Sequence, residues 1–272
     1  MFFTRLISGV ILLIIMIAAM ILGGDVLFFI TALLAFIGLY ELYKTYNIHK
    51  NMLGYAGMAG AVIYGAMVRF ALFAGDEGQQ LPMAALIVGF LLIMFVYVFT
   101  FPRFKADQAA FAVFGLVYVP VLMLCMYQVR CLEDGLFLTP LIFVSAWGND
   151  TCAYCVGRLI GKHKMAPVLS PKKSVEGAVG GVAGAVILGI LYGYFLEEYL
   201  PTLGNPMLSC AIICGAGALI AIVGDLAASA IKRNQGIKDY GRLIPGHGGV
   251  MDRFDSILFT APVVYFLALF IG

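Results

Sequence analysis

The sequence predicts an all-α membrane protein, a polytopic bundle of about nine transmembrane helices. Two features of the composition support this class: 62% of the 272 residues are hydrophobic, and only 12% are charged. Soluble domains have an apolar share of roughly 45–50%. A soluble chain of this length could not bury the excess, whereas a chain that lies in a bilayer exposes it to lipid.

Nine apolar segments approach the length that a helix needs to cross a bilayer, about 20 residues. Turn signals and charges separate them, as at Gly23-Gly24-Asp25 and Glu133-Asp134-Gly135. We expect the first segment to be retained rather than cleaved, because it lacks a convincing small-residue cleavage site. The expected helices are residues 6–23, 26–43, 53–73, 82–101, 109–128, 136–156, 176–196, 207–230 and 254–271.

Basic residues are concentrated on one side of the predicted bundle. Nine crossings place all 17 Lys and Arg residues except Arg69 and Arg130 on the side of the N-terminus, and the opposite loops are mostly acidic. An excess of Lys and Arg marks the cytoplasmic side. We therefore expect a multi-pass protein of the cell inner (plasma) membrane whose active site faces the cytoplasm.

The two halves of the chain differ in polar chemistry. Residues 1–135 are expected to form about five membrane helices, in which Glu41 and Lys44 close the second helix and extend to the interface. The alternative for Glu41 is a functional role. Residues 136–272 are expected to be the catalytic part, because they carry the two long polar loops, residues 157–175 and 231–253.

The most highly charged stretch runs from Asp225 to Asp255. Residues four, seven or eight positions apart share a helix face. One face of the eighth predicted helix therefore presents a carboxylate, a hydroxyl and two cations, from Asp225, Ser229, Lys232 and Arg233. Asp252 and Asp255 are three residues apart at the start of the next helix and also share a face.

Carboxylates from two helices beside Lys and Arg are typical of magnesium bound to phosphates. Mg²⁺ takes hard oxygen ligands, commonly one or two carboxylates with waters and substrate phosphate. Two such ions can bind the attacking and leaving oxygens of a phosphoryl displacement. We therefore hypothesise a site for metal ions and a nucleoside triphosphate at the membrane surface. The alternative is an interfacial salt-bridge network in which these charges only neutralise one another.

A glycine-rich loop, Gly246-His247-Gly248-Gly249, lies between the two groups of carboxylates. Its backbone can approach a ligand closely, because three positions lack a Cβ atom. We therefore expect Gly248 and Gly249 to lie against substrate and His247 to contact a phosphate.

A second polar region extends from Trp147 to Gly177 and includes Asp150. Pro171 after Ser170 predicts a helix that begins with a capping serine and proline at its first position. Lys172 and Lys173 would then lie at a helix N-terminus, which favours phosphate binding. The alternative is a basic loop that contacts anionic lipid headgroups.

These two regions resemble the phosphatidate cytidylyltransferases, also called CDP-diacylglycerol synthases. The resemblance covers the run from Ser229 to Asp255, with Lys232-Arg233, Lys238-Asp239 and Pro245-Gly-His-Gly-Gly in their places. It also covers Asp150-Thr-Cys-Ala-Tyr154 and Ser170-Pro-Lys-Lys-Ser-Val-Glu-Gly177, where serine at 174 replaces the more common threonine.

The resemblance implies a reaction of CTP with phosphatidic acid that gives CDP-diacylglycerol and pyrophosphate. It implies Asp225 and Asp252 as metal ligands and Asp255 as a third or outer ligand. The ions implied are one or two Mg²⁺ ions, and a monovalent ion is compatible with them. Ser229 would contact the metal ion or a phosphate, and Asp239 would orient one of the basic side chains. The expected contacts to the two substrates come from Lys232, Arg233, Lys238, Arg253, Lys172, Lys173 and Asp150.

Two other functions fit parts of the pattern. A CTP-dependent polyprenol or phytol kinase would transfer the γ-phosphate instead. An ion or solute transporter would carry charges at mid-membrane on several helices, whereas the acids here cluster at one interface. We expect no nucleic-acid partner, because the basic loops lack interleaved aromatics, and the chain is compatible with a homodimer.

Overall fold

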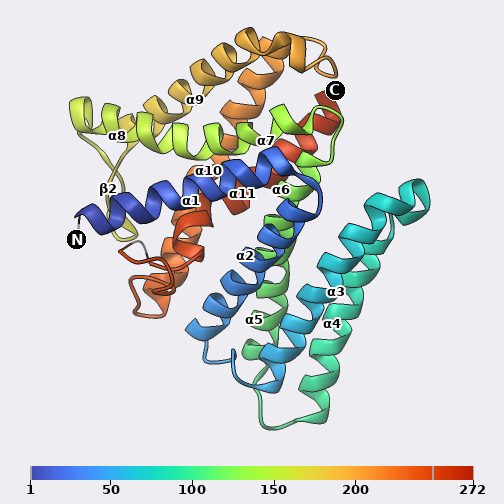
Figure 1. Ribbon diagram of the computed structural model, residues 1–272. Coiled ribbons are helices and arrows are strands. Elements are labelled where there is room, and N and C mark those ends of the chain that lie inside the picture. The colour runs from blue at the N-terminus through green and yellow to red at the C-terminus, as the bar shows by residue number, and fades with distance from the viewer. Residues whose placement is uncertain (1, 247, 272) are drawn as a thin grey trace. The chain divides into compact units, whose positions relative to one another are not determined.

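The computed structural model describes residues 2–246 and 248–271 (Figure 1). The described residues are mostly helical, with only two short strands, which confirms the all-α membrane class. Within this part of the chain, seven helices are long and apolar enough to cross a bilayer, so the protein is a multi-pass membrane protein. The count of nine crossings stays a prediction.

The chain forms two compact units, one of Met1–Leu124 with Ile237–Arg253 and one of Cys125–Gly236 with Phe254–Gly272. The predicted division into an N-terminal part and a catalytic part concerns function and stays a prediction. The first unit contains α1 (Phe2–Leu22), α2 (Gly24–Thr45), α3 (Met52–Ala74), a 3₁₀ turn (Gly75–Gly78), α4 (Leu81–Phe99), α5 (Ala106–Leu116) and a π-helical segment (Val117–Val121). The helix α6 (Leu122–Arg130) begins in this unit and ends in the second.

Close helix contacts in the first unit converge on Tyr43 of α2. Its hydroxyl donates a 2.6 Å hydrogen bond to the carbonyl of Ala112 on α5. A Cβ atom on Gly57 of α3 would overlap the Tyr43 hydroxyl, and one on Gly115 would overlap its ring. Because only glycine leaves room for the ring, these contacts fix α2 between α3 and α5.

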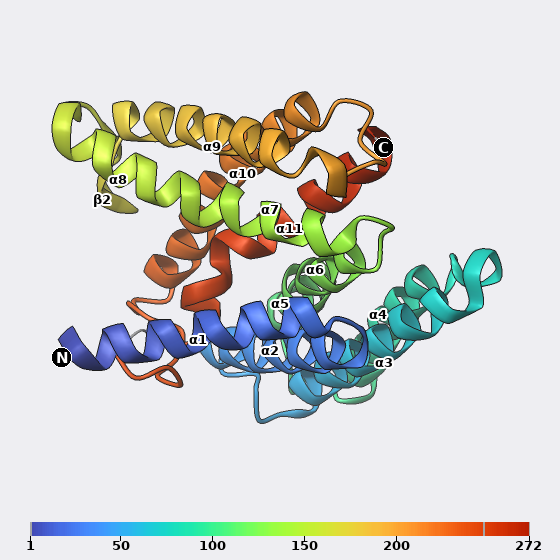
Figure 2. The ribbon, with the colours of Figure 1, turned by 45° about the horizontal axis from the view of Figure 1, so that its top comes forward.

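The second unit contains α7 (Gly135–Phe143), a π-helical segment (Val144–Gly148), α8 (Asn149–Ile160), the strands β1 (Lys164–Ala166) and β2 (Ser170–Ser174), α9 (Val175–Phe195), a 3₁₀ turn (Glu197–Tyr199) and α10 (Pro206–Asn234). The last helix, α11 (Met251–Ile271), starts in the first unit and continues in the second. Helix α9 packs against both α8 and α10 (Figures 1 and 2).

Glycines on α9 explain this close packing. A Cβ atom at Gly181 would overlap the Asn149 side chain of α8, and one at Gly189 would lie 2.6 Å from the Cys210 carbonyl of α10. Small residues let membrane helices approach closely. Gly181 and Gly189 therefore allow α9 to pack closely against α8 and α10.

Residues 164–174 form a hairpin of β1 and β2, where the sequence predicted the start of a helix. The predicted helix start at Ser170 and Pro171 is wrong, because β2 pairs antiparallel with β1 through Lys164↔Ser174 and Ala166↔Ser170. Ser174 is the residue that caps α9, and its hydroxyl accepts a 3.1 Å hydrogen bond from the Gly177 amide. Lys172 and Lys173 therefore lie on a strand rather than at a helix N-terminus.

Candidate active site

Asp252 lies in the first turn of α11, where the preceding loop folds back onto its carboxylate. Asp252 Oδ2 accepts hydrogen bonds from the amides of Tyr240 and Gly249, both at 2.9 Å. The side chain is buried. A carboxylate is stabilised at a helix N-terminus by the helix dipole and the unpaired N–H groups there. Asp252 therefore fixes both ends of the loop that precedes its helix.

The glycine-rich loop makes a tight turn above Asp252. The Ile244 amide donates to the Gly248 carbonyl at 2.9 Å, and the hydroxyl of Ser8 on α1 donates to the Pro245 carbonyl at 3.0 Å. Gly248 has a φ of 90°, and a Cβ atom there would lie 2.8 Å from Asp252 Oδ2. Glycine is thus required at 248 by both conformation and space. His247, the predicted phosphate contact, lies outside the described residues.

Glu41 of α2 supports the same loop, a role that the sequence analysis missed. Its Oε2 atom accepts a 3.0 Å hydrogen bond from the Met251 amide, and the side chain is only 6% exposed. A Cβ atom placed on either Gly241 or Gly249 would overlap the Glu41 carboxylate oxygens. The expectation that Glu41 extends to the interface is therefore wrong, because it is enclosed by this loop and satisfies an N–H at the start of α11.

In the second unit, an ion pair joins two residues from the separate motifs. Lys173 Nζ on β2 contacts Asp225 Oδ2 on α10, and both side chains are about one-quarter exposed, at 26% and 27%. Asp150 of α8 interacts electrostatically with both charges. The structure thus gathers Asp150, Lys173 and Asp225, which are far apart in the sequence.

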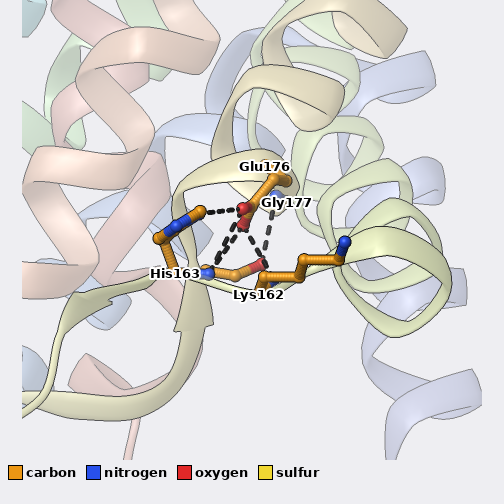
Figure 3. A network of polar contacts seen from close by, with 5 residues as sticks. Lys162, His163, Glu176 and Gly177 are labelled. Carbon is orange, nitrogen blue, oxygen red and sulfur yellow. Dashed lines mark hydrogen bonds and ion pairs between the residues drawn. The ribbon is translucent and has the colours of Figure 1, made fainter.

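The first turn of α9 anchors the hairpin that carries Lys173 (Figure 3). The Glu176 carboxylate accepts hydrogen bonds from the amides of Lys162 at 3.1 Å and His163 at 3.2 Å. It also contacts His163 Nδ1 at 2.6 Å, and the Val175 amide donates to the His163 carbonyl at 2.9 Å. Because both ends of the hairpin are held at Glu176 and Ser174, the position of Lys173 beside Asp225 is constrained.

Helices α10 and α11 meet closely next to Asp225. A Cβ atom on Gly224 would lie 2.9 Å from the Asp255 carbonyl and 2.8 Å from the Phe259 ring. Asp255 is buried, and its Oδ1 atom accepts a 2.8 Å hydrogen bond from the Ser256 amide. Ser229, Lys232 and Arg233 follow Asp225 towards the end of α10, as the spacing predicted.

Comparison with known proteins places these residues in a family. Residues 3–271 match the cytidylyltransferase family. The chain belongs to the cytidylyltransferase family. It is 34% identical over 266 residues to the phosphatidate cytidylyltransferase of Staphylococcus saprophyticus, which covers 97% of both chains. It is 34% identical over 267 residues to the enzyme of that name from Staphylococcus haemolyticus, and 31% identical over 268 residues to that from Staphylococcus aureus, again over 97% of each chain.

Membership in the cytidylyltransferase family confirms the resemblance seen in the two motif regions. Four further residues of the predicted site are exposed to solvent: Lys172, Lys238, Asp239 and Arg253. Their roles stay predictions, as does a metal site shared by Asp225 and Asp252.

The donor chemistry of the cytidylyltransferase carboxylates fits magnesium. Among residues 2–246 and 248–271, no three His, Cys, Asp or Glu side chains form a cluster that could hold a metal ion alone. Mg²⁺ does not require such a cluster, because it commonly takes one or two protein carboxylates and completes its shell with waters and substrate phosphates. Asp225 and Asp252 supply hard oxygens of this type.

We expect Glu176→Gln to loosen the hairpin and to raise the KM for CTP by about threefold to tenfold, because only one acceptor oxygen remains and the hydrogen bonds donated by the amides of residues 162 and 163 lose their charge assistance. Hydrogen exchange of the amides in residues 162–175 should become faster in the same variant. The matched control is Glu198→Gln, an exposed acid beyond the other end of α9. Unchanged amide exchange in the hairpin would contradict the anchoring role.

Proposed function

We propose that the chain is a phosphatidate cytidylyltransferase, which converts CTP and phosphatidic acid into CDP-diacylglycerol and pyrophosphate. The observation that carries this proposal is the family match over residues 3–271, which includes both motif regions. The names of relatives that share about a third of its residues over 97% of the chain support the same activity.

The reaction needs positioning more than proton transfer. An oxygen of the lipid phosphate attacks the α-phosphorus of CTP, the bond from that phosphorus to the bridging oxygen breaks, and pyrophosphate leaves with the electron pair. A phosphate monoester has a second pKa of about 6, so it is already a competent nucleophile near pH 7. This chemistry suits a site rich in Asp, Lys and Arg and poor in histidine.

Asp225 and Asp252 are the proposed ligands of Mg²⁺, with Asp255 as a third or outer ligand. When bound, Mg²⁺ would neutralise charge on the reacting phosphates. The hydrogen bonds from Tyr240 and Gly249 orient the Asp252 carboxylate. The ammonium group of Lys173 lies beside the Asp225 carboxylate. A phosphate bound at Asp225 would therefore also contact a positive charge.

The other predicted residues complete the binding of substrate in this proposal. Arginine binds phosphate through its planar fork and lysine through a point charge. Ser229 contacts the metal ion or a phosphate, and Asp239 orients a neighbouring Lys or Arg side chain. Asp150 partly neutralises the positive charge of Lys173. The cations that bind the triphosphate and the lipid phosphate are Lys172, Lys173, Lys232, Arg233, Lys238 and Arg253.

Glu41 acts in this proposal as a positioning residue. It accepts the Met251 amide hydrogen bond directly before Asp252 and contacts the loop at Gly241 and Gly249. A buried acid in a membrane helix is costly unless it has a partner, and such residues commonly serve function. We infer that Glu41 sets the position of the first turn of α11 and thereby of the Asp252 carboxylate.

The membrane topology follows from the charge distribution. The excess of Lys and Arg supports an active site on the cytoplasmic side of the inner membrane, where CTP is present. The lipid tails stay in the bilayer while the phosphate headgroup enters the site sideways. A homodimer is compatible with the chain and can be tested by mass measurement in nanodiscs.

An isotope assay tests the proposed reaction directly. Purified full-length protein is mixed with phosphatidic acid, Mg²⁺ and CTP labelled at either the α- or the γ-phosphorus. We expect label from α-labelled CTP in the lipid product and label from γ-labelled CTP in pyrophosphate. In a parallel reaction with a polyprenol or phytol in place of phosphatidic acid, transfer of γ-label to the alcohol would support a lipid kinase instead. Absence of lipid product from phosphatidic acid would refute the proposal.

Lys172 and Lys173 form a matched pair for a second test. We expect Lys173→Ala to raise the KM for CTP or phosphatidic acid by about tenfold, because this cation is in contact with Asp225 and would bind phosphate there. Lys172→Ala should have a smaller effect, and the double variant should weaken substrate binding without abolishing turnover. Steady-state kinetics for both substrates would contradict the role if neither KM changed in the double variant.

A further inference from the structure

A groove of about 540 Å³ lies at the end of the hairpin formed by α2 and α3, in the first unit. Its apolar part is lined by Phe36 of α2 and by Met58 and Val62 of α3. Its polar end is formed by His49 and Lys50 in the turn that connects the two helices. None of these residues belongs to the proposed catalytic machinery.

The polar end of the groove is suited to an anion. Lys50 is exposed, and Lys44 at the end of α2 contributes a second positive charge close to His49. Among the residues that the structure describes, the groove lining includes no acid, and the buried Nδ1 atom of His49 has no hydrogen-bond partner.

The geometry also fits an acyl chain. Tyr55, Met58 and Val62 follow one face of α3 over about two turns, a rise of roughly 10 Å. The side chains of Phe36 and Val62 are exposed, so the apolar part opens towards the lipid around these membrane-spanning helices. The Tyr40 ring packs edge-on against the His49 ring at 5.1 Å, which holds the histidine at the junction of the polar and apolar parts.

We propose that this groove binds an anionic phospholipid, with its phosphate at Lys50 and His49 and an acyl chain along Phe36, Met58 and Val62. The order of the groove, cationic at the helix turn and apolar along the helices, matches the order of headgroup and chain in a bilayer. A lipid without net negative charge would leave the cations of the turn uncompensated. Each basic residue near an anionic lipid surface favours binding by about fivefold.

The site has a structural connection to the candidate active site. Tyr40, which lines the groove, precedes Glu41, whose carboxylate accepts the Met251 amide hydrogen bond. An occupied groove would therefore restrain the same turn of α2 that supports the loop before Asp252. Binding itself does not depend on the proposed reaction and is measured without CTP.

Photolabelling of the full-length protein in nanodiscs tests the proposal. The probes are phosphatidic acid, phosphatidylglycerol and phosphatidylcholine with the same diazirine-bearing acyl chain, each diluted into phosphatidylcholine. We expect the anionic probes to label residues 52–62 at least about fivefold more than the phosphatidylcholine probe. Labelling by phosphatidic acid alone would identify a phosphate monoester as the ligand, and labelling by both anionic probes would show that a diester is also accepted.

Two variants and a control make the result specific. Lys50→Gln should lower anionic labelling of the groove about fivefold, and Val62→Trp should lower it by filling the apolar part. Lys105→Gln, an exposed lysine of the same unit outside the groove, should leave labelling unchanged. Equal labelling by the three probes, or no effect of Lys50→Gln on anionic labelling, would overturn the proposal.

Discussion

Asp252→Asn is expected to lower CDP-diacylglycerol formation by more than about 100-fold, an effect at least as large as that of removing an outer-shell partner in a metal site. Asparagine retains a carbonyl oxygen that can accept the hydrogen bonds donated by the amides of Tyr240 and Gly249. The loop should therefore stay in place while the negative charge proposed to bind Mg²⁺ is lost. Turnover at saturating CTP, phosphatidic acid and Mg²⁺ measures the effect.

Asp252→Ala separates the structural role of this side chain from its chemical role. Alanine removes the acceptor as well as the charge, so two buried amides lose their partner, and thermal stability should fall in addition to activity. The asparagine variant should keep a wild-type thermal midpoint. Asp107→Ala, an exposed acid at the start of α5, is the control. Near-normal turnover of Asp252→Asn at saturating Mg²⁺ would refute the metal role.

The membrane class and the order of the site residues could be predicted because they depend on local features. Hydropathy over about 20 residues identifies a membrane helix whatever its neighbours are. The spacing of Asp225 and Ser229 likewise defines one face of a helix without knowledge of the fold. The structure extends this helix to Asn234, so Lys232 and Arg233 lie in the last turn of α10 and continue the face that Asp225 begins.

The hairpin could not be predicted from the same kind of evidence. Ser170-Pro171 and Ser174 are both acceptable helix starts, and the local sequence does not choose between them. The choice is made by strand pairing between residues 164–166 and 170–174 and by the contacts of Glu176 with Lys162 and His163. These contacts join residues up to 14 positions apart, whereas helix periodicity and capping patterns concern only residues within one or two turns.

Pairings between distant residues were also beyond the sequence pattern. Several basic residues could have formed the ion pair with Asp225, and the sequence does not indicate that Lys173 is the one that does. Glu41 did leave a signal, because an acid inside an apolar helix needs a partner. Its partner, the Met251 amide, lies 210 residues away and belongs to the backbone, so no residue type in the sequence identifies it.

Glu41→Ala is expected to lower kcat by about 10- to 100-fold, the range typical for residues that orient metal ligands. The change leaves the buried Met251 amide without its acceptor and opens space beside Gly241 and Gly249. The first turn of α11 should become mobile, and with it Asp252. The Mg²⁺ concentration that gives half-maximal activity should therefore rise, while the KM for CTP changes less than kcat does.

The Glu41→Gln variant distinguishes positioning from a general loss of stability. Glutamine keeps an acceptor oxygen on a side chain of the same length, so it should restore most of the activity that alanine loses. Glu77→Ala, an exposed acid of the same unit, serves as the control and should behave as wild type. If Glu41→Ala lost thermal stability but kept its kcat and Mg²⁺ dependence, Glu41 would be a structural residue only.

A glycine substitution tests the same contact from the other side. A Cβ atom at Gly241 would overlap Glu41 Oε1, so Gly241→Ala should displace the carboxylate and reproduce the Glu41→Ala defect. Residues in direct contact have non-additive effects on free energy. Because Glu41→Ala removes the atoms that the new methyl group would meet, the double variant should be no less active than Glu41→Ala alone. Additive losses in kcat would show that Gly241 and Glu41 act independently.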